Sequence, residues 1–123
     1  MHETGVAMEI YRASLQAAEA HGPGRLERVR VAVGELSAVD PELLAYAWEA
    51  VVAGTPDEGC PLEVEWHRAR QSCAACGQDK ERAEGSWLPV CPDCGQFLTV
   101  EGGRELDLLQ VSYLPDEPGG AHV

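Results

Sequence analysis

Two Cys-x-x-Cys-Gly motifs constrain the fold of this 123-residue chain more than any other feature. The first pair is Cys73 and Cys76, and the second is Cys91 and Cys94, with fourteen residues between the pairs. Each Cys-x-x-Cys turn presents two sulfurs from one tight bend, and two such bends facing one another supply four thiolates for a tetrahedral Zn²⁺. We therefore expect a closed, structural zinc site with no open coordination position.

Two other interpretations of the four cysteines stay open. Four tetrahedral thiolates also suit a single iron ion, as in rubredoxin-like electron-transfer modules, and the motifs alone do not separate iron from zinc. Two disulfides are the third option. Because the chain starts without the pattern of a signal peptide, we expect a reducing, cytoplasmic location, where paired cysteines more often bind metal.

The composition excludes some classes of partner. The 21 acidic and 9 basic residues give a formal net charge of −12, which repels a phosphate backbone, so we expect no nucleic-acid partner. An acidic surface better suits cations or a basic protein surface. No apolar run is long enough to span a membrane. A chain of this length buries only a modest core, so a metal would add needed stability.

Hydrophobic periodicity in the first half predicts a helix, a strand and a second helix. The first helix is expected over residues 5–20, with an apolar face at four positions: Val6, Ile10, Ala13 and Ala17. Alternation of Val29, Val31 and Val33 then predicts a half-buried strand that ends at Gly34. The second helix starts at Asp40-Pro41-Glu42, with Asp40 as its N-cap, and ends at Gly54.

The second half predicts two further long strands around the cysteine module. Residues 62–67 alternate as a strand, and Trp66 on it is expected in the core together with Trp48. Short strands are expected at 86–90 and 96–100. A last strand over 106–114 should return to the first sheet, with Leu109, Val111 and Tyr113 on one face and Leu106 and Leu108 on the other.

These elements predict an α+β fold in which two helices lie on a small mixed three-stranded sheet, with an inserted zinc-ribbon-like module that holds the four cysteines. The expected division is residues 1–70 plus 104–114 as one domain and 71–103 as the zinc module. Residues 115–123 are expected to be a disordered tail.

The N-terminus offers a second set of metal donors. The α-amine of Met1, the backbone nitrogen of His2 and its imidazole can reach one cation through fused chelate rings. The backbone nitrogen of Glu3 can add a fourth, nearly coplanar donor. Planar nitrogen sets favour Ni²⁺ or Cu²⁺ over tetrahedral Zn²⁺. A histidine in a frayed terminus is the alternative interpretation of His2.

Six short stretches give the chain a clear resemblance to one family. They are Met1-His2-Glu3, Val31 to Leu36 (Val-Ala-Val-Gly-Glu-Leu), Val39 to Glu42, Gly54-Thr55-Pro56, and the two cysteine motifs. In this order they resemble the HypA/HybF family of hydrogenase nickel-insertion proteins over about residues 1 to 114.

The resemblance implies a cytosolic nickel metallochaperone with Ni(II) at the N-terminus and a separate structural Zn(II). His2 would be the essential nickel ligand beside Met1 and Glu3. Asp40 matches a family position near the nickel end, although an N-cap role is the simpler interpretation. The implied partners are a nickel-binding GTPase of the maturation pathway and the hydrogenase large subunit, and some family members also supply urease. The sequence leaves a homodimer open.

No residue pattern in the chain predicts an enzyme. We find no nucleophile beside a base, no phosphate-binding glycine loop and no open three-ligand zinc site. Cys60 is expected to be a buried or loop thiol, and His67 to be solvated or in an outer-shell contact with the zinc site. Besides nickel delivery, two functions stay open: a rubredoxin-like iron redox module and a zinc-ribbon adaptor without a nickel site.

Overall fold

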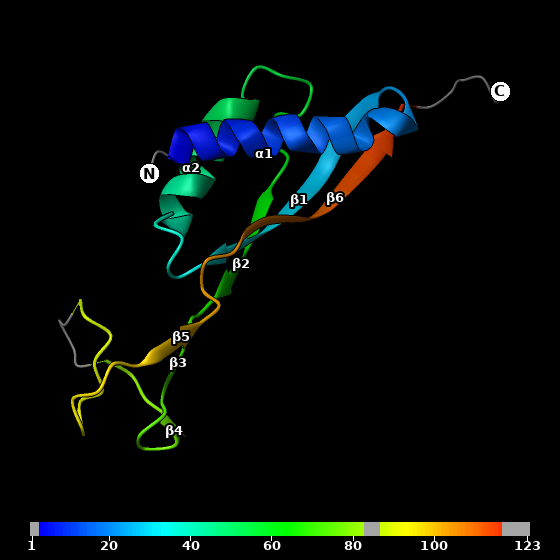
Figure 1. The fold of residues 1–123 in the computed structure, drawn as a ribbon. Coiled ribbons are helices and arrows are strands. Elements are labelled where there is room, and N and C mark those ends of the chain that lie inside the picture. The colour runs from blue at the N-terminus through cyan, green and yellow to red at the C-terminus, as the bar shows by residue number, and fades with distance from the viewer. Residues whose placement is uncertain (1–2, 83–86, 117–123) are drawn as a thin grey trace.

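The computed structural model describes residues 3–82 and 87–116. Two helices lie against a mixed three-stranded sheet, and a smaller sheet that carries the cysteines projects from one end of it (Figure 1). The predicted α+β class is confirmed. The elements are, in chain order, α1 (Glu3–Ala18), β1 (Gly24–Gly34), α2 (Pro41–Val52), β2 (Leu62–His67), β3 (Arg70–Cys73), β4 (Gln78–Asp79), β5 (Thr99–Glu101) and β6 (Leu106–Pro115).

Helix α1 starts and ends two residues earlier than predicted, and a 3-10 turn at Glu19–His21 follows it. Its buried stripe also differs from the predicted one. Ala17 is exposed, and Ser14 is fully buried because its hydroxyl donates to the Ile10 carbonyl at 2.7 Å. The residues that α1 buries are Val6, Ala7, Ile10, Ser14 and Ala18.

Helix α2 starts where its capping sequence predicted. An Asp40 carboxylate oxygen accepts from the backbone N–H groups of Glu42 at 2.9 Å and Leu43 at 3.2 Å, and Pro41 fills the first helical position. The helix buries Leu44, Trp48 and Val52 against the sheet. It connects β1 to β2, which pair in parallel, as expected for a strand–helix–strand unit.

The main sheet has the strand order β2-β1-β6, and β6 returns antiparallel to β1 as predicted. Two register shifts interrupt this pair: Glu27 is an extra residue in β1, and Leu109 is an extra residue in β6. The predicted face assignment for β6 was therefore wrong at Leu108 and Leu109. Leu108 packs on the core with Val111 and Tyr113, whereas Leu109 is exposed.

A loop carboxylate ties the helices to the sheet. Asp57, in the loop before β2, is 5% exposed; it accepts from the Leu26 backbone N–H at 2.7 Å and from the Tyr11 hydroxyl at 2.6 Å. Burial, followed by this hydrogen bond, raises the pKa of Tyr11. Leu26 is buried and Tyr11 is partly buried, so Asp57 satisfies polar groups of two separate elements at once.

The second sheet has the order β4-β3-β5. It differs from the predicted short strands: β3 pairs with β5 through Arg70–Glu101 to Ser72–Thr99, and between 87–90 and 96–98 the described residues form one isolated bridge, Val90 to Phe97. Ser86 of the predicted strand lies outside the described residues. Alternation alone could not locate β3 because it continues almost directly from β2.

Three chain segments cross closely where the two sheets meet. A Cβ atom at Gly34 would lie 2.2 Å from the Gly103 oxygen, and one at Gly103 would lie 2.6 Å from the Ala69 Cβ. The Glu35 carboxylate accepts from the Ala69 N–H at 2.7 Å, and the Leu36 N–H donates to the Gly103 carbonyl. This junction explains why glycines stand at positions 34 and 103.

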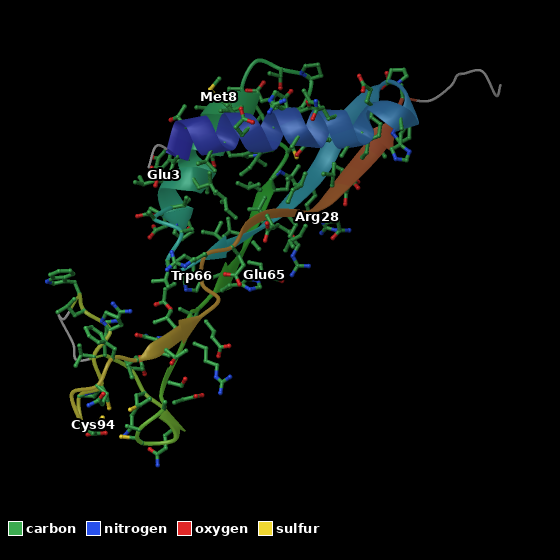
Figure 2. The ribbon with its side chains drawn as sticks, viewed as in Figure 1. Glu3, Met8, Arg28, Glu65, Trp66 and Cys94 are labelled. Carbon is green, nitrogen blue, oxygen red and sulfur yellow. The ribbon has the colours of Figure 1, made fainter. Side chains whose placement is uncertain are left out.

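Two further expectations concern Trp66 and the C-terminus. Trp66 was predicted in the core and is 47% exposed; it lies at the end of the sheet near the junction (Figure 2). Trp48 is 1% exposed, buried as predicted.

Pro115 is the last residue of β6, and the predicted tail lies outside the described residues from 117 onward. Among the helices of the described residues, none is long and apolar enough to cross a membrane.

Candidate metal centre

The structure brings the four predicted cysteines together. The Sγ atoms of Cys73 and Cys94 are 3.5 Å apart, those of Cys76 and Cys91 are 4.0 Å apart, and all four lie within 4.8 Å of one another. Four sulfurs at about 2.3 Å from one tetrahedral Zn²⁺ are separated by about 3.8 Å. The arrangement therefore fits a four-thiolate metal ion.

Two similar turns place these sulfurs. The N–H of Gly77 donates to the Cys73 carbonyl at 2.8 Å, and the N–H of Gly95 donates to the Cys91 carbonyl at 2.9 Å. Both glycines have positive φ, 69° and 78°, as the motifs predicted. Each turn thus folds back on itself and directs its two sulfurs toward the opposite turn.

Hydrogen bonding within the cluster separates the acidities of its thiols. The Cys76 backbone N–H donates to the Cys73 sulfur at 3.4 Å and lowers the pKa of Cys73 to about 7. The hydrogen bond to the Cys73 sulfur in turn raises the pKa of Cys76 to about 12. One thiol therefore ionises near neutral pH, and capture of a metal must displace protons from the others.

A lysine offsets the negative charge of the cluster. The Lys80 side chain is 18% exposed, and its ammonium forms an ion pair with the carboxylate of Asp93, between Cys91 and Cys94. This pairing, with the nearby cysteines, raises the pKa of Lys80. A Zn²⁺ ion with four thiolates carries a net charge of −2, so a partly buried cation beside it is favourable. Sequence analysis did not single out Lys80.

The cysteines also form the interior of their own module. Its buried cluster consists of Cys73, Cys91 and Leu98, with Cys76 packed against them. Trp87 and Phe97 of the same module are 82% and 72% exposed, so the module buries few apolar side chains besides Leu98. A metal ion would therefore replace the hydrophobic core that the module lacks.

Of the predicted nickel residues, the structure describes Glu3 and Asp40. Met1 and His2 lie outside the described residues, so the structure does not test their role. Glu3 is the first residue of α1, and its carboxylate accepts from the Asp40 backbone N–H at 3.0 Å. This bond lowers the pKa of Glu3. The start of α1 is therefore held against the start of α2, in the neighbourhood the resemblance implied for Asp40.

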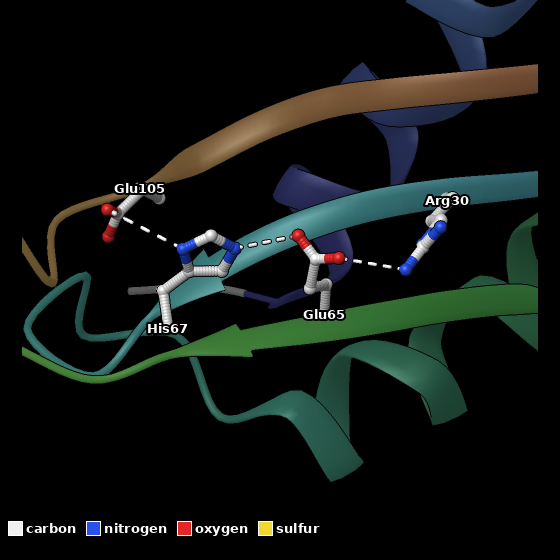
Figure 3. Close-up of polar contacts among 4 residues, drawn as sticks. All are labelled: Arg30, Glu65, His67 and Glu105. Carbon is white, nitrogen blue, oxygen red and sulfur yellow. Dashed lines mark hydrogen bonds and ion pairs between the residues drawn. The ribbon is translucent and has the colours of Figure 1, made fainter.

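His67 lies at the junction of the two sheets and not in the cysteine cluster. Its Nε2 is 2.8 Å from a Glu65 oxygen, and its Nδ1 is 3.8 Å from Glu105 (Figure 3). The other oxygen of Glu65 accepts from Arg30 at 2.8 Å. The hydrogen bond to His67 is the main cause that lowers the pKa of Glu65. Arg30, Glu65 and His67 thus form a row of ionisable side chains on the face of the main sheet that the helices do not cover.

Cys60 is 7% exposed and lies in the core beside α2. A buried position was one of the two locations expected for it. Its carbonyl accepts the indole N–H of Trp48 at 2.7 Å. Burial raises the pKa of the Cys60 thiol to about 11, so this cysteine is poorly suited to bind metal or react. It stands apart from the four-cysteine cluster.

Fold and site together define a small α+β metal-binding protein with a four-cysteine module inserted between two strands of its sheet. A family profile described as "Hydrogenase/urease nickel incorporation, metallochaperone, hypA" matches residues 1–113. The chain belongs to the HypA family. As a member of this family of maturation factors it is a metallochaperone and not an enzyme.

Individual relatives agree with this assignment. The hydrogenase maturation factor HypA of Methanopyrus kandleri is 38% identical over 142 residues, which cover 100% of this chain and 99% of the relative. That of Chlorobaculum tepidum is 36% identical over 107 residues, or 86% and 93% of the two chains. The solution structure of the Ni metallochaperone HypA from Helicobacter pylori shares the fold, with a TM-score of 0.61, 24% identity, and coverage of 94% of this chain and 100% of that chain.

Proposed function

We propose that this protein binds Ni(II) at its N-terminus and delivers it to the large subunit of a [NiFe]-hydrogenase in the cytoplasm, together with a nickel-binding GTPase. The contact between Glu3 and the Asp40 backbone carries this proposal. It anchors the first turn of α1 at a defined place on the folded domain, far from the cysteine module (Figure 1). The two metals would then have separate sites with different donors.

The start of α1 suits a set of nitrogen donors. The first four backbone N–H groups of a helix have no intrahelical acceptor, so the amide of Glu3 is free of that bond. The positive end of the helix dipole favours negative charge, which includes an ionised amide. Together with the Met1 amine and the His2 amide and imidazole, the Glu3 amide would complete the planar set that Ni²⁺ prefers.

The carboxylates near this site have structural roles that restrict their use as ligands. One Asp40 oxygen caps α2, and a Glu3 oxygen accepts from the Asp40 N–H. We therefore assign Asp40 to positioning the N-terminal segment and Glu3 to contributing its backbone nitrogen. A weakly packed terminal site also allows transfer, because an acceptor can reach the metal without unfolding the domain.

For the cysteine cluster we propose a structural Zn(II) that stays bound during nickel transfer. We further propose that residues 71–103 form this zinc module and that residues 1–70 with 104–114 form the nickel domain. An iron ion in the same four thiolates would make a rubredoxin-like module, and its oxidised form would be red. A colourless purified protein with one zinc per chain by elemental analysis supports the proposal, and a visible iron spectrum contradicts it.

The central test is the variant His2→Ala. We expect it to lose stoichiometric Ni²⁺ binding, because the imidazole and its chelate ring are removed, and to keep its zinc and its fold. Isothermal titration of the untagged protein with Ni²⁺, paired with zinc analysis and circular dichroism, measures both. His21→Ala is the matched control, since His21 lies at the other end of α1. Unchanged nickel titration in His2→Ala would defeat the proposal.

A second variant tests the amine. Two residues added before Met1 convert the α-amine into an amide and remove one donor without changing any side chain. We expect nickel affinity to fall at least ten-fold in this extended protein. Normal nickel loading by the extended form would show that the amine is not a ligand.

A further inference from the structure

A long apolar groove runs between α1 and β6. Its first part, about 570 Å³, lies between the N-terminal half of α1 and the start of β6, and its second part, about 310 Å³, lies between the end of α1 and the rest of β6. Leu108 lines both parts. Figure 1 shows α1 following β6 along the side of the sheet.

The helix supplies more apolar surface than its own core uses. Ala13 and Ala17 form a stripe beside the buried one and, with Val6, line the groove. From the strand, Leu106 and Leu109 reach it with 39% and 46% of their surface exposed. Exposed apolar side chains that gather along one groove are a common sign of a binding surface.

Strand β6, which lines the groove, has an unpaired edge among the described strands. Strand β6 is an edge strand, because β1 is its only partner among the described strands, and it is ten residues long. The outward N–H and C=O groups of such an edge can pair with another extended chain. Backbone pairing along an edge, with side-chain pockets beside it, is the arrangement that binds peptides by strand addition.

Charge disfavours a second copy of this chain. Asp107 lies near one end of β6 and Asp116 directly beyond the other, so antiparallel pairing of two copies would bring these carboxylates together. The net charge of −12 adds general repulsion. A segment with basic residues at its ends would instead be attracted.

We propose that α1 and β6 form a docking groove for an extended segment of the protein that receives the nickel. The segment adds to β6 as a fourth strand, places alternate apolar side chains under α1, and carries Lys or Arg at its ends. The inference rests on the proposed function, since the groove starts one turn of α1 from the nickel site. Docking there would place the acceptor beside the metal.

The test measures binding of a purified hydrogenase large-subunit precursor to full-length, zinc-loaded protein by calorimetry. Leu106→Lys and Leu109→Lys together place charge in the groove at positions that are already exposed. We expect at least a ten-fold loss of affinity, with nickel stoichiometry unchanged. Leu15→Lys on the exposed side of α1 is the matched control, because Leu15 is 43% exposed and does not line the groove.

Hydrogen exchange then distinguishes strand pairing from side-chain contact alone. Binding should newly protect alternate amides of β6, and salt should weaken the complex. Full affinity in the double variant, an equal loss of affinity in Leu15→Lys, or an unprotected β6 would overturn the groove proposal while nickel binding stands. A wild-type protein that binds nickel but not the precursor would overturn it as well. Failure of wild type to bind nickel would instead defeat the proposed function.

Discussion

Trp48 and Cys60 secure the centre of the helical layer. The indole of Trp48 donates to the Cys60 carbonyl at 2.7 Å, and the Tyr11 ring meets the indole edge-on, with 5.9 Å between centroids. These contacts keep Cys60 in an apolar site, where its thiol is held in the neutral form. The residue contributes to stability as a small buried group, and its chemistry is suppressed by its surroundings.

Cys60 should make the free energy of unfolding depend on pH in the alkaline range. Its thiol ionises at a pKa of about 8.5 in an unfolded chain and about 11 in the fold. Because folding raises this pKa, the stabilisation is complete below about pH 8.5 and is lost as the pH rises to about 11. Between about pH 8 and pH 11, we expect the free energy of unfolding to fall by about 2–3 kcal/mol more in wild type than in Cys60→Ala.

Urea denaturation of the zinc-loaded proteins at several pH values measures this difference. Both proteins share the metal-bound thiolates, the tyrosines and the lysine, so their titration cancels in the comparison. The constant cost of the smaller Ala side chain also cancels, because only the pH dependence is compared. Parallel curves for the two proteins would rule out a raised pKa at Cys60.

At the scale of elements, two bulges decide which side chains of the β1–β6 pair reach the core. Leu108 and Val111 are three residues apart and yet share the core face, because Leu109 is the extra residue between them. In β1, Leu26 and Val29 are related in the same way through Glu27. Each bulge also bends its strand, which helps the pair to follow the helices above it.

Single-residue deletions in β6 should therefore differ in cost. Removing Leu109 leaves Leu108 and Val111 two residues apart and still on one face. Removing Ser112 turns Tyr113 away from the core and breaks its hydrogen bond to the Gly22 carbonyl. We expect the Ser112 deletion to cost about 2–4 kcal/mol and the Leu109 deletion at least about 1 kcal/mol less. Thermal unfolding of the two variants measures this, and equal costs would contradict the bulge assignment.

At the scale of the whole molecule, two units depend on different sources of stability. The helices and main sheet share a continuous core of thirteen buried residues. Among its described residues, the cysteine module has a buried cluster of three, of which two are metal ligands in our proposal. Crossing segments at Gly34, Ala69 and Gly103 join the two units through backbone contacts.

Loss of the metal should consequently unfold one unit and leave the other. We expect Cys91→Ser to remove amide protection from residues 70–101, because few apolar contacts remain there, while protection in α1, α2 and β1 persists. Zinc analysis and hydrogen exchange on the full-length variant provide the measurement. Ala74→Ser, in the first turn but outside the ligand set, is the control. Native protection across 70–101 in metal-free Cys91→Ser would contradict this expectation.

Much of this architecture follows from local sequence. Three features depend only on residues within one turn or one strand. They are the N-cap of α2, the positive φ of Gly77 and Gly95, and the strand at 62–67. Local chemistry is sufficient there, since a capping carboxylate or a glycine turn acts over three or four residues. The spacing of the cysteines similarly predicted a cluster that the fold does assemble.

Other features required the tertiary structure. The exposure of Trp66 reflects where the helices end above the sheet, and the position of Leu109 reflects the register against β1. The carboxylate of Asp57 accepts hydrogen bonds from residues that are 31 and 46 positions away in the sequence. Lys80 pairs with Asp93, which is 13 positions away. Periodicity along the chain carries no information on such partners.

The sequence by itself determined the four-cysteine cluster, the two helices and the family. Only the tertiary structure decided how these parts are placed, with the start of α1 held on Asp40, the cysteine module joined at a glycine crossing, and β6 left as an edge. The reason is physical. Donor type and local conformation belong to single residues and short segments, whereas burial, register and strand edges exist only between segments that are distant in the chain.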